Sequence, residues 1–426
     1  MARLRLVRDA ALGAREETVS ESARIEAQPL TGITVIDLSQ IYNGPYATFM
    51  MAAAGARVIK VEPPGGEPLR RRGVVGGAAL PFAMLNGCKE CVVLDLKEEP
   101  GKDALKVLVS KADVVVENYA PGTMERLGLG AATLQALNPR LIYASSSGFG
   151  RDGPYKSFPA MDLTVQAMSG VMEITGFPDR PPVKAGPALC DFFAGVHLYG
   201  AIATALFERE RTGVARCVEV AMQDAVYASL SSSLGMHWGN AGRRDAPPPR
   251  TGNRHGGLAE SPYNVYPTTD GYIAIICVGD IHWGNLARAM GRPELLEEER
   301  FSSLKKRVSV MDEVDALVSA WTSKRTKADA FGTLMANKVP CAPVRNLDEV
   351  VNDPNMHARG ALQWQDHPQL GRIVVQHSPM RYVGAKRRVL RPSGELSADT
   401  VAVLTEFGIA DNVNDRAGRP TREGPV

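Results

Sequence analysis

The sequence of 426 residues lacks a strong net charge and lacks long apolar runs. Lys and Arg number 49 and Asp and Glu number 47, which leaves a formal net charge of only +2. Such a balance gives no general attraction to nucleic acid or to an anionic membrane, so any basic site must be local. No apolar run approaches the ~20 residues that a bilayer-spanning helix needs. We therefore expect no nucleic-acid partner and no membrane segment.

The N-terminus lacks the features of a targeting segment. Residues 1–31 are rich in arginine but also contain acidic residues throughout, whereas transit peptides are poor in acids and secretory signals need an apolar core. We interpret this segment as a surface arm of a cytoplasmic protein. The six cysteines are scattered and lie mostly in apolar runs, as is typical of reduced thiols. Cys88 and Cys91 form a Cys-x-x-Cys pair, but no second pair or histidine cluster follows, so no metal site is predicted.

The first third of the chain alternates β-branched runs with helical patterns. Strands are predicted at residues 33–38, 56–62, 92–96, 112–117 and 141–144, with helices between them at 47–54, 100–109, 124–129 and 132–137. Gly44-Pro45-Tyr46 is expected to break the chain before the first helix. Strands that alternate with helices favour an α/β fold with a doubly wound, Rossmann-like parallel sheet.

The usual signatures of that fold's common ligands are missing. No G-x-G-x-x-G follows the first strand; the turn there is Ser39–Gly44. The chain also has no G-x-x-x-x-G-K-[ST] phosphate loop and no G-x-S-x-G nucleophile elbow. A nicotinamide or flavin enzyme and a serine hydrolase are therefore both disfavoured.

The second half of the chain changes character at a break rich in proline, glycine and arginine, Ala241–Gly257. Beyond it, Asp270-Gly271 between two apolar runs indicates a β-hairpin, and several helical patterns follow. The expected organisation is an N-terminal arm at 1–31, the first part of a large domain at 32–235, a linker and small mixed α+β domain at 236–345, and a C-terminal segment at 346–426 that returns to the large domain.

The stretch Leu141–Gly170 is the strongest candidate for a site. An apolar strand leads into the small-residue loop Ser145–Gly150, and Asp162 then opens a helix with apolar residues at Leu163 and Met168. A carboxylate that follows a glycine-rich turn at the end of a strand lies where open α/β sheets bind ligands. Asp is also a favoured helix N-cap, so spacing alone leaves a capping role and a functional role both open.

Several blocks, in order and at characteristic spacing, resemble one family. They are Asp37–Glu62, Ala112–Gly128, Asn138–Gly150 and Gly213–Val226. With them the chain resembles the family III CoA-transferases, the group that includes formyl-CoA:oxalate and carnitine CoA-transferases, from about residue 32 to about residue 408. Members of this family are interlocked homodimers, so the resemblance implies a homodimer.

The resemblance also implies a chemistry. Asp162 matches the family's nucleophile, which forms a mixed anhydride with the acyl group and then an aspartyl thioester with CoA. CoA is then a substrate, passed from an acyl-CoA donor to a small carboxylic acid, and no permanently bound cofactor or metal is needed. Family positions that contact CoA match Leu94, Asn118, Tyr119, Arg126 and Leu127. Arg70, after a Pro-Gly turn, is a further candidate for phosphate or carboxylate.

Other features of the site have less support. The Ser145–Gly150 loop and the glycines Gly256 and Gly257 are candidates for oxyanion donors. Oxalate-type members carry a glutamine where this chain has Tyr42 and a lysine where it has Ser147, so the resemblance does not specify oxalate or formate as the acid.

Two rival functions share the expected fold. One is an acyl-CoA racemase, which needs a histidine directly before the aspartate, where this chain has Met161. The other is a non-catalytic CoA-binding protein. Only the transferase should trap CoA covalently on Asp162.

Overall fold

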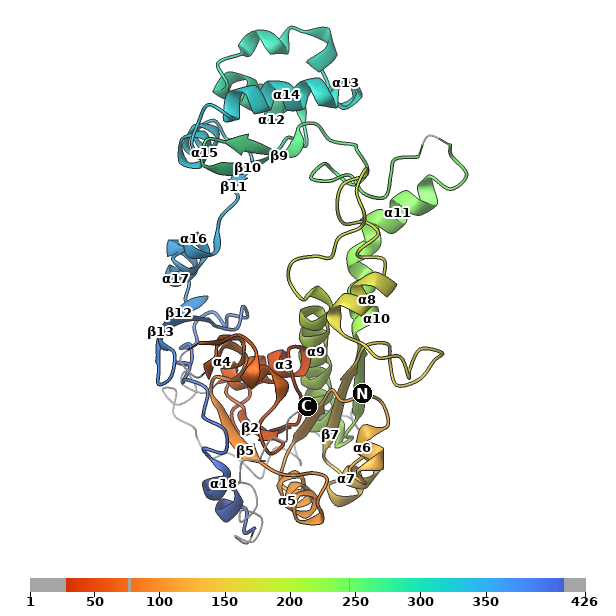
Figure 1. The fold of residues 1–426 in the computed structure, drawn as a ribbon, viewed down its shortest axis with the longest axis vertical. Helices are drawn as coiled ribbons and strands as arrows, with labels where there is room; N and C mark the ends of the chain where they lie inside the picture. Colours follow the sequence, from red (N-terminus) through yellow and green to blue (C-terminus); the bar gives the residue numbers. More distant parts are fainter. Residues whose placement is uncertain (1–27, 76–77, 245, 410–426) are drawn as a thin grey trace, which may run out of the picture. The chain divides into compact units, whose positions relative to one another are not determined.

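The computed structural model describes residues 28–75, 78–244 and 246–409 (Figure 1). The chain forms two compact units. Among the described residues, the first comprises those within 28–157, 191–221 and 354–409, and the second those within 158–190 and 222–353. Except for residues 28–31, the predicted N-terminal arm lies outside the described residues.

The first unit contains a six-stranded sheet in the order β5-β2-β1-β6-β7-β8. All of its neighbouring strands run parallel. The strands are β1 (Thr34–Asp37), β2 (Arg57–Glu62), β5 (Lys89–Val93), β6 (Val114–Glu117), β7 (Ile142–Ser147) and β8 (Cys217–Ala221). The prediction of an α/β fold with a parallel sheet is confirmed.

Helices cover both faces of this sheet because successive strand residues point to opposite sides. Ile36 faces one apolar core, which includes α5 (Glu99–Ser110), α7 (Ala131–Leu137) and α18 (Thr400–Glu406). Val35 faces the other core, which includes α3 (Asn43–Ala53) and α9 (Leu189–Thr212). The remaining elements of this unit are the 3₁₀ turn η1 (Pro68–Arg71), β3 (Val74–Val75), β4 (Ala78–Ala79), α4 (Leu80–Asn86), α6 (Thr123–Arg126), α17 (Pro354–Ala358), β12 (Leu362–His367) and β13 (Gly371–Gln376).

Two sequence predictions near the carboxyl end of the sheet were wrong. Gly44-Pro45 does not break the chain but lies in the first turn of α3, where a missing N–H costs nothing. The expected loop Ser145–Gly150 begins later, because Ser145, Ser146 and Ser147 continue β7. Their pairing partner is β8, with Ser147 opposite Ala221. A strand some 70 residues further along the chain therefore decides their conformation (register Ser145 to Glu219).

The edge strand β5 is protected by residues from the far end of the chain. The Cys91 amide donates to Asp399 Oδ2 at 2.7 Å, and the Val93 amide donates to Thr400 Oγ1 at 3.0 Å. An edge strand otherwise presents free amides that invite pairing with other chains. The start of α18 therefore completes the sheet.

Helix α9 corrects the expectation that no apolar segment is long enough to cross a bilayer. Its 24 residues pass that test by length and composition, with a mean hydropathy of 1.4 over the most apolar window. Its Leu198, Ile202 and Leu206 are buried in the core beside α3. Its apolar composition therefore serves, at least on that face, to cover the sheet.

The second unit is built around the antiparallel sheet β11-β10-β9. The Asp270-Gly271 hairpin prediction is confirmed, since Gly271 pairs with Thr268 at the start of β10. The strands are β9 (Tyr263–Thr268), β10 (Gly271–Ile276) and β11 (Cys341–Pro343). The helices are α8 (Asp162–Met168), α10 (Met222–Tyr227), α11 (Ser231–Gly239), α12 (Asp280–Ala289), α13 (Leu304–Ser309), α14 (Met311–Thr322), α15 (Lys327–Ala336) and α16 (Leu347–Val351), with 3₁₀ turns η2 (Ala228–Leu230), η3 (Pro293–Leu296) and η4 (Glu299–Phe301).

A fully buried ion pair joins β1 to β5 in the first unit. Lys89 Nζ donates to Asp37 Oδ2 at 2.9 Å, and neither side chain is exposed. Burial alone would raise the pKa of Asp37, but the charges of Lys89 and Lys60 outweigh it and hold the pKa well below its usual range. Thr48 Oγ1 donates to the same carboxylate oxygen at 2.7 Å. The carboxylate is thus compensated only while its partners are present.

Replacing Lys89 with methionine should destabilise the first unit strongly. Removing one partner of a buried pair leaves an uncompensated charge, which typically costs about 3–5 kcal/mol. Urea denaturation would measure the free energy of unfolding. The matched control is Lys106→Met, because Lys106 forms an exposed pair with Asp103 and should contribute little. Equal losses in the two variants would contradict this account of the pair.

Candidate active site

Asp162 is the first residue of α8, and its N-cap residue is Met161. The two oxygens of the Asp162 carboxylate have different donors. Oδ1 accepts from the Cys190 amide at 2.9 Å, and Oδ2 accepts from Gln166 Nε2 at 2.6 Å. Neither donor is an amide of the first turn of α8, so these bonds are not those of an N-cap.

Gln166 connects Asp162 to a second segment of the chain. It lies four residues after Asp162, one turn along α8, and its side chain is fully buried. Its Oε1 accepts from the Ala185 amide at 2.9 Å. Gln166 therefore has one fixed orientation, with its NH₂ group toward the carboxylate. Asp162 itself is half-buried, so its carboxylate is oriented from behind while part of the residue stays accessible.

The predicted helix after Asp162 is confirmed, and its exposed surface includes apolar side chains. Leu163 and Met168 are 51% and 42% exposed. The buried residues of α8 are Val165 and Gln166. The buried face is therefore set by the polar contact between Gln166 and Asp162 as well as by apolar packing.

Three residues that were predicted to contact CoA meet in one apolar cluster of the first unit. Leu94 follows β5 and is buried, while Tyr119 follows β6 and Leu127 follows α6; the latter two pack against the same core. Leu94 and Tyr119 thus lie near the carboxyl ends of parallel strands, the edge at which open α/β sheets bind ligands. Tyr119 and Leu127 are partly exposed and offer an apolar surface of the kind that a nucleotide base needs, whereas Leu94 is 1% exposed and supports it from the core.

The polar residues that were predicted to contact CoA differ in how many of their hydrogen-bonding groups already have partners within the protein. Asn118 Nδ2 donates to the Gln40 carbonyl at 2.8 Å and to Asn43 Oδ1 at 2.7 Å, and its Oδ1 accepts from the Gln40 amide at 2.8 Å. Its side chain thus ties down the loop after β1. Arg126 is exposed and donates to Thr123 Oγ1 at 2.9 Å, and no ion pair of Arg126 occurs within the described ranges.

Arg70 already has a charged partner. Its Nε and one Nη donate to the two oxygens of Glu62, each at 2.7 Å, and its guanidinium lies 3.8 Å from the centre of the Phe82 ring. The carbonyl of Gly394 accepts from the same group at 3.2 Å. A phosphate at this position would have to compete with Glu62, whereas a phosphate at Arg126 would not.

Some of the candidate oxyanion donors already donate hydrogen bonds to groups within the protein. The Gly150 amide donates to Ser147 Oγ at 3.1 Å. Gly150 has a φ of +95°, which favours glycine at this turn. In the second unit, the Gly257 amide donates to His255 Nδ1 at 3.1 Å. The sequence did not reveal these internal partners.

Within the described ranges, no group of three or more His, Cys, Asp or Glu residues has the arrangement of a metal site. All six cysteines are free thiols, and Cys88 and Cys91 are both buried.

A buried carboxylate that the sequence analysis missed lies beside Asn118. Glu117, the last residue of β6, is buried, and its Oε2 accepts from the Tyr119 amide at 2.8 Å. Its Oε1 lies 3.1 Å from Arg151 Nη1 and 3.4 Å from the Tyr143 hydroxyl. Burial raises the pKa of Glu117 to about 7, although the Tyr119 amide and the Arg151 charge both oppose the rise. A glutamate directly after an apolar strand was the one signal in the sequence.

The comparisons with known proteins agree with the fold and identify the family. A crystal structure of a CaiB/BaiF family protein from Brucella suis matches with a TM-score of 0.81 and 32% identity, over 90% of this chain and 100% of that chain. The model of CoA-transferase family III matches residues 30–400. The chain therefore belongs to CoA-transferase family III and is a CoA-transferase.

Relatives with named activities cover nearly the whole chain. The acetyl-CoA:oxalate CoA-transferase of Acetobacter aceti is 38% identical over 383 residues, which are 89% of this chain and 96% of that protein. The succinate–glutarate CoA-transferase of Agrobacterium fabrum is 36% identical over 395 residues, with the same coverage of 89% and 96%. Both relatives transfer CoA between carboxylic acids, according to their names.

Glu117→Gln should change how stability depends on pH. Because the pKa of Glu117 in the folded protein lies above its ordinary value of 4.5, its contribution to stability is complete below about pH 4.5 and is lost as the pH rises toward 7. The loss is of the order of 3 kcal/mol, since each pKa unit corresponds to about 1.4 kcal/mol. Glutamine cannot ionise, so the variant should lack this loss. Urea denaturation at pH 5 and pH 7.5 would compare the two proteins, and parallel pH profiles would contradict the prediction.

Proposed function

We propose that this CoA-transferase moves CoA between carboxylic acids through covalent intermediates on Asp162. The observation that carries the proposal is the Asp162 carboxylate, half-exposed at the start of α8 and oriented by one donor on each oxygen. The family and the named relatives support the overall reaction. In the proposed complex an acyl-CoA is the donor, a small carboxylic acid is the acceptor, and CoA is a substrate.

The first half of the reaction has two covalent steps. A carboxylate oxygen of Asp162 attacks the thioester carbonyl, the C–S bond breaks, and CoA leaves as a thiolate, which gives a mixed anhydride. The thiolate then attacks the aspartyl carbonyl, the donor acid leaves as a carboxylate, and an aspartyl-CoA thioester remains. The acceptor carboxylate reverses both steps. Each intermediate conserves an activated acyl bond, which is the advantage of nucleophilic catalysis here.

The two donors to Asp162 have a role in this sequence. When the thiolate attacks the aspartyl carbonyl, negative charge develops on the aspartyl oxygen that is not bonded to the acyl group. In the resting protein each oxygen already has a donor, the Cys190 amide or the Gln166 side chain. A donor in place before the charge develops stabilises the oxyanion without reorganisation. The same bonds fix the carboxylate for attack on the thioester.

CoA recognition is assigned to the first unit. We propose that Tyr119 and Leu127, supported by the buried Leu94, form the apolar surface for the adenine. Arg126 is the proposed phosphate partner, because its planar charge has no ion-pair partner in the described part of the chain. Asn118 positions the loop after β1 and can present only its backbone to CoA without losing those bonds.

The rival functions have less support. A racemase of this fold needs a base beside the aspartate, and Met161 has no ionisable group. A non-catalytic CoA-binding protein would not need a carboxylate oriented on both oxygens. The expected homodimer and the expected cytoplasmic location stay predictions.

Asp162→Asn should abolish transfer and covalent labelling. The amide cannot act as the nucleophile, so intact-protein mass spectrometry after mixing with acyl-CoAs should show no CoA or acyl adduct, whereas the unchanged protein should show one that maps to Asp162. The matched control is Asp179→Asn, an exposed aspartate of the same unit paired at 3.6 Å with its neighbour Arg180. Substantial CoA exchange by a folded Asp162→Asn protein would overturn the mechanism.

Gln166→Leu should lower kcat by about ten- to a hundred-fold with little change in KM for the acyl-CoA. A hydrogen bond to a charged group is worth about 1.5–3 kcal/mol, and its loss frees the carboxylate to rotate. Steady-state kinetics would separate kcat from KM, and circular dichroism would check the fold. Thr164→Val is the control, because Thr164 lies on the same turn but bonds to the Met161 backbone. A rise in KM alone would contradict a positioning role for Gln166.

A further inference from the structure

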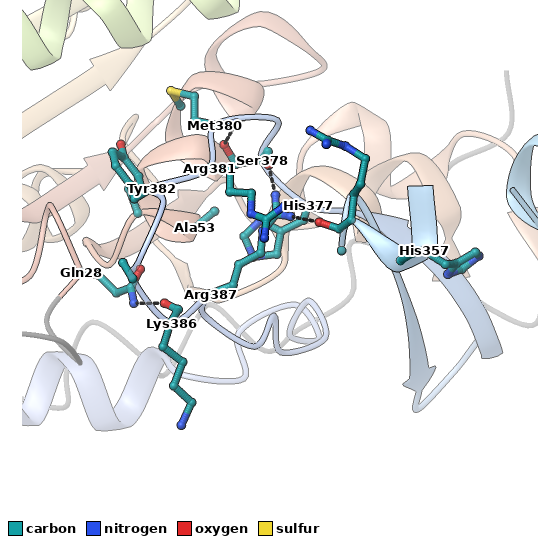
Figure 2. Close-up of a pocket in the computed structure, with 15 residues that line it drawn as sticks. Gln28, Ala53, His357, His377, Ser378, Met380, Arg381, Tyr382, Lys386 and Arg387 are labelled. Atoms are coloured by element: carbon teal, nitrogen blue, oxygen red, sulfur yellow. Dashed lines mark hydrogen bonds between the residues drawn. The ribbon is translucent and has the colours of Figure 1, made fainter. Parts of the chain in front are cut away.

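A separate cavity in the first unit is lined by basic side chains. Its volume is about 330 Å³, and it lies between the end of α3, the end of α17 and the loop at residues 377–387 (Figure 2). Arg359, Arg381 and Arg387 line it together with His377 and Gln28. No aspartate or glutamate is among the described residues that line it. None of these residues belongs to the Asp162 site or to the predicted CoA contacts.

Arg387 lies at the centre of this cluster and is fixed by neutral partners. Its Nη1 donates to the Arg359 carbonyl at 3.0 Å, and its Nη2 donates to the Ser378 carbonyl. Its Nε is buried and has no partner within the described residues. Figure 2 shows the two bonds to carbonyl oxygens, while the side chain of Lys386 extends away from the cluster. Carbonyl oxygens orient the guanidinium but do not neutralise its charge.

No negatively charged side chain among the described lining residues balances the basic groups of the cluster. Burial lowers the pKa of Arg387, and the charges of Arg381 and Arg359 lower it further. Burial also lowers the pKa of His377, which keeps that imidazole neutral near pH 7. No ion pair of the three arginines occurs in residues 28–75, 78–244 or 246–409. Arg359 and Arg381 are exposed and Arg387 is partly buried, so solvent screens part of their mutual repulsion, and an anion in the cavity would reduce it further.

Two arginines that are more deeply buried than Arg387 are arranged differently. Arg307 is fully buried and lies 2.8 Å from Asp280, and Arg209 is 2% exposed and lies 2.9 Å from Asp113. In both places the protein supplies a carboxylate to an arginine whose role is structural. Arg387 is partly buried and has only carbonyl oxygens as hydrogen-bond partners among the described residues.

We infer that this cavity binds a small multiply charged oxyanion of the phosphate class. Guanidinium groups present planar pairs of N–H donors that match phosphate oxygens, and several of them around one cavity favour a ligand with more than one negative charge. The anion bridges the arginines and relieves their mutual repulsion. The ligand is either free phosphate or a phosphate group of CoA, which share this chemistry.

Isothermal titration of the full-length protein with inorganic phosphate, at constant ionic strength set with chloride, tests the inference. We expect saturable binding at one site. Arg381→Gln and Arg387→Gln should each weaken it by about ten-fold or more, because each removes a charged hydrogen-bond donor. Arg381 is exposed, so its replacement should not disturb the fold. Arg372→Gln is the control, because Arg372 lies over the Trp364 ring and outside the cavity.

A second titration identifies the source of the phosphate. CoA added to the phosphate-saturated protein either displaces phosphate, which assigns the cavity to a phosphate group of CoA, or binds independently, which assigns it to free phosphate. Both results support an oxyanion site. The absence of saturable phosphate binding would overturn the inference, as would equal affinity in Arg381→Gln and Arg372→Gln. Dissociation of an oligomer by Arg381→Gln, with phosphate binding unchanged, would also overturn it and assign the cluster to a contact between chains.

Discussion

The buried carboxylate of Asp37 is the interaction on which the predicted CoA-binding edge of the sheet depends. It accepts bonds from Lys89, Thr48 and the Ser39 amide, at distances between 2.7 and 3.0 Å. Lys60, also fully buried, donates to the Ser39 carbonyl at 2.7 Å. Charges from three parallel strands thus fix Ser39, the second residue after β1. Such buried pairs do not necessarily add net stability, because desolvation is costly, but they leave the loop few alternative conformations.

That loop is fixed at its other end by different polar contacts. Glu67 accepts from the Ile41 amide at 3.1 Å, and Asn118 bonds to both Gln40 and Asn43. Ile41 has a φ of 65°, which a β-branched residue adopts only where its surroundings enforce it. The buried charges, Glu67 and Asn118 together account for this conformation. These contacts join the start of α3 to the segment that follows β6.

The parts of the fold that sequence could predict are those set by local pattern. The β-branched runs gave the parallel sheet, Asp270-Gly271 gave the hairpin, and the helix at Asp162 follows from a polar residue before a helical pattern. The parts that could not be predicted depend on distant partners. Ser145–Ser147 became a strand because of β8, and Asp399 reaches Cys91 from the other end of the chain.

In the candidate site, too, the sequence identified the residue but not its surroundings in the fold. The family blocks and the spacing pointed to Asp162, but its donors, the Cys190 amide and Gln166, come from a segment 28 residues away and from one turn along α8. The raised pKa of Glu117 could not be predicted either, because it arises from burial in the folded protein, which the sequence alone does not show.

Tyr42 also packs against a residue that is distant in the sequence. Its ring stacks on Phe192 of α9 at 5.8 Å, and Tyr46 meets the same ring edge-on at 5.0 Å. Sequence left open whether these tyrosines pack in a core or line a pocket, and the contacts show that packing is at least part of their role. A glutamine at this position could not reproduce the stacking on Phe192, because it has no aromatic ring. This position, at which the chain differs from the glutamine of oxalate-type members, is therefore coupled to the packing of α9.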